Sequence, residues 1–443
     1  MKIYNSKSNK IEKFVPIKDG KVSLYLCGPT VYNFAHIGNA RPIVVFDLLR
    51  RVLEETGYEV EFVSNYTDID DRIIEKALKE MTSEKVIADR YISAYEMVRN
   101  GLHADEVDQK PRVTQVIPDI IEFIEVLIDK GYAYVVEGDV YFRVNRVETY
   151  GQISNQKLDE LKVGARIEEN VQKENPLDFV LWKKTDDEGI TWDSPWGKGR
   201  PGWHTECVVM IHNAFGDRID IHGGGQDLRF PHHENESAQS YAYHQHDLAN
   251  YWVHNAMLQI DGEKMSKSLG NVIWAQDYID KFGSNVTRWL LISTHYRLTL
   301  NISDETIKQS QKEINRIETA LKNAYINLEL KNINIDDYNI DKDNFERFMM
   351  YLKNDLNVAN AQAVLFEKIK DVNANTRIKK FERLASDVKT VERMLDVLGI
   401  IIPRIKLEPD QKELFGKWDQ YKANKEFEKA DVIRQQLIEM GLL

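Results

Sequence analysis

A strand, a helix and a second strand follow one another near the N-terminus, and this order restricts the fold more than any other feature of the chain. Lys21–Leu26 (KVSLYL) has the β-branched and aromatic content of a short strand. A helix is predicted from near Gly38 through VVFDLLRRVLEETG, and Glu59–Asn65 (EVEFVSN) is the next strand. Such a βαβ unit implies a parallel sheet that binds its ligand at the carboxyl ends of the strands.

The rest of the chain separates into an insertion, a return to the sheet and a helical region. Pro111–Gly199 looks like an insertion that contains an amphipathic helix (IPDIIEFIEVLIDKG) and a hairpin (AYVVEGDVYFRV). Strands of the main sheet resume at Arg218–His222, directly before a glycine triplet, and at Asn250–Ile260. The pattern of Ser303–Ile400 is helical and includes FERFMMYLKNDLNVANAQAVLFEKIKDV as one segment.

We therefore predict an α/β protein in which a Rossmann-type domain with a parallel sheet is split by an insertion and followed by an α-helical domain. The expected parts are residues 1–110 (first half of the Rossmann-type domain), 111–199 (connective insertion), 200–258 (second half), 259–302 (a lysine-containing loop and a linking fold), 303–402 (helical bundle) and 403–443 (short C-terminal tail).

Composition excludes several classes of protein. The 443 residues are 42% hydrophobic and 29% charged, as in globular proteins, and no apolar run reaches the roughly 18 residues of a membrane span. The N-terminus lacks the apolar core of a signal peptide, so a cytoplasmic protein that does not bind membranes is expected. Two cysteines argue against a disulfide framework. The net charge of -12 does not indicate nucleic-acid binding, although a local basic face would suffice for it.

Both cysteines lie in stretches that resemble functional motifs, and one of these stretches ends in HHENE. His232 and Glu236 are four residues apart, so a helix would place them on one face. Cys27 and Cys207 are each predicted at a strand end that faces one cleft. We infer that these four residues surround a zinc ion, which accepts sulfur, imidazole and carboxylate ligands. Taken singly, each cysteine also fits a small buried hydrophobic residue, and the His–Glu pair fits a solvated helix face.

Two glycine-containing motifs are candidates for nucleotide binding. His36 and Gly38 precede the first helix, whose N-terminus offers N–H groups to a phosphate. A glycine triplet lets a ligand approach the backbone, and Asp227 after it could hold an ammonium group or a ribose hydroxyl. The triplet consists of Gly223, Gly224 and Gly225. An ordinary loop and a flexible turn are the alternative interpretations of these two motifs.

Two lysines and a few pocket residues complete the candidates. Lys264 and Lys267 flank small polar residues in a turn-rich loop, where such charges stabilise transferring phosphates. Trp203 would wall a substrate pocket, or it is a core tryptophan. Thr67 lies at the end of the second strand and would contact substrate or cap a helix. A solvated surface loop is the alternative for the lysines.

Several long motifs in order make the chain similar to a known family. The stretches LYLCGPTVYNFAHIGNAR, NYTDIDD, RPGWHTEC, DIHGGGQDLRFPHHENE and KMSKSLGN resemble those of the cysteinyl-tRNA synthetases, which are class I aminoacyl-tRNA synthetases. The likeness covers nearly the whole chain. HIGN and KMSKS correspond to the signatures of the class, whereas the cysteine and HHENE stretches are specific to this family.

The resemblance implies an ATP-dependent ligase. L-cysteine would react with ATP to give cysteinyl-adenylate, and the 3′-terminal adenosine of tRNA(Cys) would then accept the cysteinyl group. One Zn²⁺ per chain would be held by Cys27, Cys207, His232 and Glu236 and would select the substrate thiolate; Mg²⁺ would accompany ATP. A monomer is expected. The phosphate chemistry is assigned to His36, Asn39, Lys264 and Lys267, the ATP contacts to Gly38, Gly223, Gly224, Gly225 and Lys267, and the amino-acid pocket to Thr67, Trp203 and Asp227.

The sequence departs from the family pattern in two places. Asn39 stands where the HIGH signature ends in histidine, and its amide can still donate to a phosphate or ribose oxygen, so activity is expected. Many relatives continue beyond the last helix with a segment that helps to read the anticodon. In this chain we expect anticodon recognition either to be reduced or to be carried by the helical region and the tail Trp418–Leu443 alone.

Three other functions are compatible with parts of the pattern. A cysteine ligase of the mycothiol-pathway type shares the catalytic domain but lacks a full C-terminal tRNA-binding region, and roughly a third of this chain follows the KMSKS loop. A non-catalytic paralogue that senses cysteine, zinc or RNA would be expected to lose a zinc ligand or a KMSKS lysine, and none is lost. A structural zinc protein would leave the nucleotide motifs unexplained.

Overall fold

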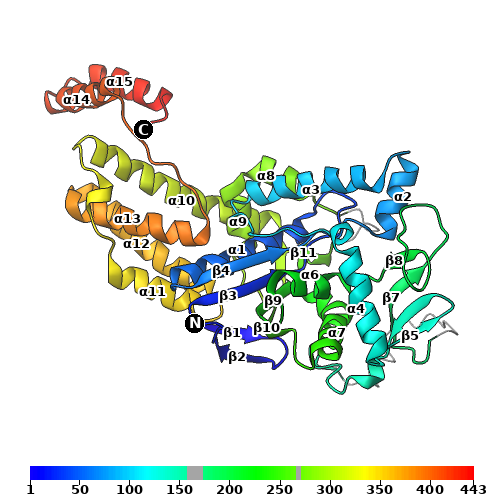
Figure 1. Ribbon diagram of the computed structural model, residues 1–443. Helices are drawn as coiled ribbons and strands as arrows, with labels where there is room; N and C mark the ends of the chain where they lie inside the picture. The colour runs from blue at the N-terminus through cyan, green and yellow to red at the C-terminus, as the bar shows by residue number, and fades with distance from the viewer. Residues whose placement is uncertain (157–172, 266–270) are drawn as a thin grey trace. The chain divides into compact units, whose positions relative to one another are not determined.

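The computed structural model describes residues 1–156, 173–265 and 271–443, apart from the side chain of Lys264 (Figure 1). The chain forms two compact units: residues 1–303 with 353–356, and residues 304–352 with 357–443. The prediction of six parts is not tested by this division and stays a prediction. Among the described residues, no helix combines the length and the apolar character needed to cross a bilayer.

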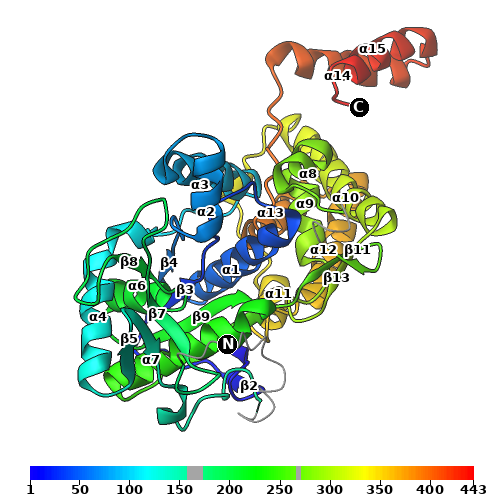
Figure 2. The same cartoon turned by 90° about the vertical axis from the view of Figure 1, so that its right-hand side faces the viewer.

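A four-stranded parallel sheet lies at the centre of the first unit. Its strands, in the order β10-β9-β3-β4, are β10 (Ala249–Asn255), β9 (Ile219–Gly225), β3 (Lys21–Leu26) and β4 (Glu59–Ser64). The helix α1 (Ile37–Glu55) connects β3 to β4 and packs against the sheet (Figure 2). The predicted βαβ unit and the splitting of the sheet by an insertion are therefore confirmed.

The sequence predicted that the glycine triplet follows a strand, but the triplet forms the last three residues of that strand. Gly223, Gly224 and Gly225 all lie within β9. A Cβ atom on Gly223 would stand 2.1 Å from the ring of Phe46 in α1. The missing side chain thus allows α1 to pack closely on the sheet, which is why glycine occurs inside a buried strand.

The predicted strand Asn250–Ile260 is also wrong in its extent. It divides into β10 and β11 (Leu258–Ile260), which belong to different sheets. The strand β11 pairs in parallel with β13 (Leu300–Ile302) and antiparallel with β12 (Glu263–Lys264). Arg41 of α1 donates to the carbonyls of Ala256 and Met257, which accounts for the break between the two strands.

The insertion forms a second sheet, which is antiparallel, and the predicted hairpin is confirmed. The helix of the insertion is α4 (Ile117–Asp129). The turn of the hairpin, at Glu137 and Gly138, has positive φ angles of 53° and 100°. The strands, in sheet order, are β5 (Ala133–Val136), β6 (Asp139–Phe142), β7 (Phe179–Lys184) and β8 (Gly199–Pro201). A separate hairpin at the N-terminus pairs β1 (Lys2–Asn5) with β2 (Lys10–Lys13).

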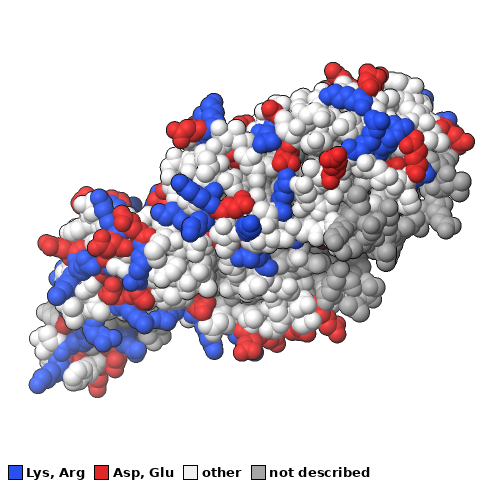
Figure 3. Space-filling view, turned by 90° about the horizontal axis from the view of Figure 1, so that it is seen from below, with Lys and Arg blue, Asp and Glu red and all other residues white. Residues whose placement is uncertain are grey.

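Among the described residues, six further α-helices belong to the first unit. They are α2 (Asp71–Lys79), α3 (Glu84–Gly101), α6 (Glu206–Phe215), α7 (Glu234–His244), α8 (Ala275–Phe282) and α9 (Ser284–Ile292). On the face shown in Figure 3, acidic and basic side chains alternate, so the negative net charge does not form a field of one sign there.

The second unit is helical. It contains α10 (Asp304–Glu329), α11 (Lys342–Leu352), α12 (Val358–Ile378), α13 (Phe381–Leu398), α14 (Pro409–Ala423) and α15 (Phe427–Glu439). The single helix predicted over FERFMMYLKNDLNVANAQAVLFEKIKDV is wrong. It breaks at Asp355 and Leu356, which have φ angles of 57° and 51°, and the side chain of Asn357 caps α12 by accepting from the Asn360 N–H.

Candidate metal centre and nucleotide-binding residues

The two cysteines approach one another from different kinds of element. Cys27 follows β3, and its N–H donates to the carbonyl of Gly223 in β9. The predicted place of Cys207 at a strand end is wrong, because Cys207 is the second residue of α6. The apolar run Val208–Ile211 that follows it suits a fully buried helix as well as a strand, and periodicity alone cannot separate the two.

His232 and Glu236 complete the cluster from one continuous stretch of helix. His232 lies just after a kink at Phe230, whose φ and ψ of -140° and 134° are not helical, and Glu236 lies in the first turn of α7. Cys207, His232 and Glu236 are 3%, 2% and 0% exposed, so these three side chains are shielded from bulk water.

The ligand atoms stand at distances that suit a tetrahedral metal site. Cys27 Sγ lies 3.5 Å from both Cys207 Sγ and Glu236 Oε1. His232 Nε2 lies 2.9 Å from Glu236 Oε1 and 3.8 Å from Cys207 Sγ. Ligands about 2.0–2.3 Å from a zinc ion stand about 3.3–3.8 Å apart in a tetrahedron. Three of the four distances lie in this range, whereas the 2.9 Å between His232 and Glu236 is that of a direct hydrogen bond, which a bound zinc ion would replace and widen. The residues present therefore fit zinc in donor type and number.

The electrostatics of the cluster also favour a cation. A hydrogen bond from Cys27 lowers the pKa of the Cys207 thiol to about 6, and His232 adds to this effect. Burial lowers the pKa of His232, but Glu236 and Cys207 outweigh burial and raise this pKa to about 10. The protein thus places a positive imidazolium beside a thiolate and a carboxylate, in the position that a divalent cation would take.

A row of buried histidines next to the cluster was not predicted from the sequence. His222 Nε2 lies 2.5 Å from Glu236 Oε2, and its ring is fully buried. His233 Nδ1 lies 2.8 Å from His254 Nε2. The ligand atoms of Cys27, His222, His233 and Glu236 form a second group compatible with a metal. The only signal in the sequence was a histidine within a strand-like apolar run.

Two of the predicted pocket residues lie beside the cluster. The ring of Trp203 stacks on that of His232, with centroids 4.3 Å apart, and the Trp203 side chain is 41% exposed. Thr67 Oγ1 donates to Glu206 Oε2 at 2.9 Å, directly before Cys207 in α6. Asp227 lies in a short turn after β9, and its carboxylate would clash with a Cβ on Gly225.

The predicted phosphate residues lie at the start of α1. His36 is the N-cap residue of this helix, and its backbone N–H donates to Asn39 Oδ1 at 3.1 Å. Asn39 Oδ1 is therefore engaged in capping the helix, and the donation of its amide Nδ2 to a phosphate or ribose oxygen stays a prediction. A Cβ on Gly38 would lie 2.9 Å from the His36 ring, so glycine leaves room for that ring. Lys267 and the Lys264 side chain lie outside the described residues.

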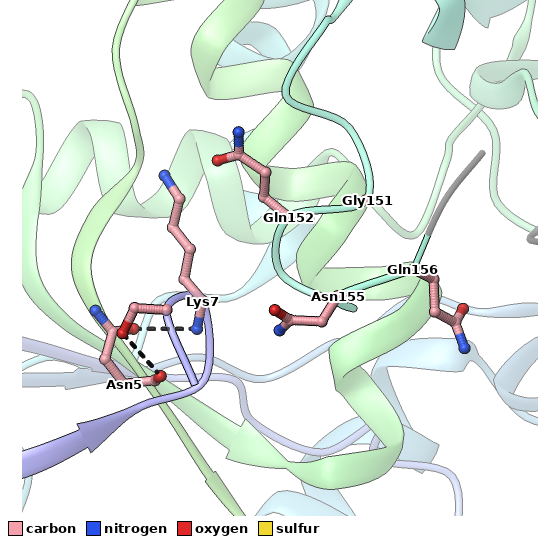
Figure 4. A pocket seen from close by; sticks show the side chains of 7 residues that line it. Asn5, Lys7, Gly151, Gln152, Asn155 and Gln156 are labelled. Atoms are coloured by element: carbon pink, nitrogen blue, oxygen red, sulfur yellow. Dashed lines mark hydrogen bonds between the residues drawn. The ribbon is translucent and has the colours of Figure 1, made fainter. Parts of the chain in front are cut away.

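A cavity of about 460 Å³ opens elsewhere, between the N-terminal hairpin and the loop that ends at Gln156 (Figure 4). Polar side chains of Asn5, Lys7, Gln152 and Asn155 point toward it, and Lys7 is paired with Asp247 at 2.7 Å. None of the predicted site residues lines this cavity.

Comparison with protein families finds matches over most of the chain. Residues 13–312 match the family of class I (C) tRNA synthetase catalytic domains, and residues 347–402 match the DALR domain. The cysteine–tRNA ligase of Halalkalibacterium halodurans is 44% identical over 450 residues, which cover 100% of this chain and 97% of that protein. The cysteine–tRNA ligase of Clostridioides difficile is 44% identical over 454 residues, with the same coverage.

Solved structures of other synthetases share the fold. The methionyl-tRNA synthetase of Mycobacterium tuberculosis, in complex with methionyl-adenylate, aligns with a TM-score of 0.63 at 13% identity, covering 85% of this chain and 89% of that one. An arginyl-tRNA synthetase from Campylobacter jejuni aligns with a TM-score of 0.60 at 15% identity, covering 89% and 96%. At these identities the likeness concerns the fold alone.

Proposed function

Because this chain belongs to the cysteine–tRNA ligase family of class I tRNA synthetases, we propose that it joins L-cysteine to the 3′ end of tRNA(Cys) through a cysteinyl-adenylate. The observation that carries this proposal is the buried cluster of two thiols, an imidazole and a carboxylate at the carboxyl end of β3. Parallel sheets of this type bind their ligands at that edge.

We propose that Cys27, Cys207, His232 and Glu236 hold one Zn²⁺. Of the two groups of possible ligands that contain Cys27, this one includes both sulfurs, which zinc favours, and it leaves His222 to bond Glu236 Oε2. Zinc bound there would take the thiolate of cysteine as a further ligand, which serine, with its hard and protonated hydroxyl, cannot supply. His222 orients the carboxylate, and Trp203 limits access to His232 from solvent.

The remaining residues are proposed to position the substrates. Thr67 is tied to Glu206 and borders the amino-acid pocket, and Asp227 is placed to hold the ammonium group or a ribose hydroxyl. His36 and the positive end of the α1 dipole would bind phosphate of ATP-Mg²⁺, while Asn39 caps this helix. Lys264 and Lys267 are proposed to stabilise the transferring phosphates, and Gly38, Gly223, Gly224 and Gly225 to let ATP approach the backbone.

The wider setting is proposed from the same family. A monomer in the cytoplasm that does not bind membranes remains our expectation. Helices α11 to α13 overlap the DALR match and, with the tail, are proposed to bind tRNA. This match argues against the alternative that the chain is a mycothiol-type cysteine ligase, because such ligases lack a full region of this kind.

The first experiment is charging of a tRNA(Cys) transcript with labelled cysteine, ATP and Mg²⁺, with serine as the control amino acid. We expect cysteine-dependent charging and none with serine. Cysteine-dependent ATP–pyrophosphate exchange without charging would contradict our proposal and favour the cysteine ligase of the mycothiol-pathway type. No cysteine-dependent exchange at all would refute the proposed activity.

Replacing His222 by asparagine should weaken zinc binding about 10- to 100-fold, because the shorter side chain no longer holds Glu236 Oε2. Competition with a chelator measures this change. The control is His295→Asn, in the same unit, whose ring lies 3.6 Å from Asp355. Zinc affinity equal to that of the unaltered protein, in a His222→Asn protein with a normal melting temperature, would contradict the assigned role.

A further inference from the structure

A second group of possible metal ligands lies on the surface, at the opposite ends of the helices that carry Cys207 and Glu236. It consists of Asp217, His244 and His246, whose ligand atoms all lie within 4.8 Å of one another. Asp217 follows the C-terminus of α6, and His244 is the last residue of α7. The cluster is partly exposed, so an ion in solution can reach it.

The orientation of His246 leaves one ring nitrogen facing a carboxylate. His246 Nδ1 lies 3.0 Å from the carbonyl oxygen of Asp247 and therefore donates its proton to that oxygen. His246 Nε2 lies 2.5 Å from Asp217 Oδ1. With Nδ1 engaged by the backbone, Nε2 is the ring nitrogen that faces the carboxylate, in a direct contact that a metal bound by both groups would widen. A backbone carbonyl that fixes the tautomer is a common partner of metal-binding histidines.

His244 is placed to supply the third ligand. Its ring stacks on that of His246, with centroids 5.1 Å apart and planes 15° from parallel. Gln245 between them has a left-handed φ of 64°, which turns the chain so that both rings lie together. In the described part of the chain, the ring nitrogens of His244 make no hydrogen bond.

We propose that Asp217, His244 and His246 form a second metal site, selective for borderline divalent cations such as Zn²⁺, Co²⁺ or Ni²⁺. Two imidazoles and one carboxylate suit these ions better than Mg²⁺ or Ca²⁺, which prefer oxygen ligands. Water would fill the remaining positions. The ion would join the C-terminal ends of α6 and α7, whose first turns carry Cys207 and Glu236. This inference does not depend on the proposed function.

Cobalt titration of the full-length, metal-depleted protein tests the proposal. We expect two equivalents of Co²⁺ to bind. One should give the strong charge-transfer absorption of thiolate ligands, and the other only weak visible bands, since it has no sulfur ligand. His246→Gln and His244→Gln should each lose the second equivalent and keep the thiolate band, which also shows that these variants fold.

Two controls separate the sites. Cys207→Ala should lose the thiolate band and keep the weak equivalent. His212→Gln alters a neighbouring ring, 5.2 Å from that of His244, that is not in the group, and should retain both equivalents. A single equivalent in the unaltered protein that shows the thiolate band, or a second equivalent that survives in His246→Gln, would overturn the proposal and leave His246 and Asp217 as a simple ion pair.

Discussion

Replacing Cys207 by alanine should abolish stoichiometric zinc binding and lower cysteine-dependent ATP–pyrophosphate exchange by more than about 100-fold. Loss of a residue that only orients a ligand commonly costs 10- to 100-fold, and Cys207 is proposed as a ligand itself. Its thiol has a pKa lowered to about 6, chiefly by the hydrogen bond from Cys27, so it is the group in the cluster prepared to bind as thiolate at neutral pH. Zinc content and exchange are measured on the same preparation.

A matched control distinguishes a local loss of metal from a general loss of structure. Asn213→Ala removes an exposed side chain from the same helix, where it bonds Asp119 at 2.7 Å. This variant should keep its zinc and its activity. A Cys207→Ala protein with normal zinc content and normal exchange would refute the assignment of the metal ligands. Cys27→Ala should repeat the result of Cys207→Ala, because both sulfurs lie on the same site.

The fold was predictable where local pattern and tertiary environment agree. In the strands Lys21–Leu26 and Glu59–Ser64, apolar residues first alternate with polar ones and are then buried in a continuous run. The helix between the two strands has a glycine near its start and another just after its end. The apolar stretch after Cys207 misled the prediction because a buried helix and a buried strand look alike over so few residues. The strand through Gly225 was ended too early because glycine is uncommon inside strands, and the reason for Gly223 is its close packing against Phe46, which lies far away in sequence.

The site was predictable in part, since the sequence names candidate donors but not their neighbours. Cys27, Cys207, His232 and Glu236 were singled out by residue type and motif, and the structure brings their ligand atoms together. The contact between His222 and Glu236 joins β9 to α7, and no spacing along the chain reveals it. The capping role of Asn39 was likewise hidden, because the motif suggests a phosphate contact and only the backbone geometry shows the bond to His36.

Replacing Asp47 by alanine should destabilise the first unit by about 3–5 kcal/mol, since it leaves the charge of Arg288 buried without its carboxylate. Arg288 is 0% exposed, and its guanidinium contacts Asp47, which also accepts from Arg51 Nε at 2.9 Å. The melting temperature should fall by roughly 10 °C. The control is Glu59→Ala, which removes an exposed ion pair with Lys21 and should leave the melting temperature nearly unchanged.

The fall of the free energy of unfolding at acid pH, here called the acid limb, gives this prediction a second readout. Burial raises the pKa of Asp47, but Arg288 and Arg51 outweigh burial and lower it below its usual range. The stabilisation by Asp47 is therefore complete above the unfolded-state pKa of about 3.9 and is lost as the pH falls through the lower folded-state pKa. Asp47→Asn should flatten the decline of stability in this acid range. An unchanged acid limb, or a melting temperature as high as that of Glu59→Ala, would show that the Asp47–Arg288 pair does not hold α1 against α9.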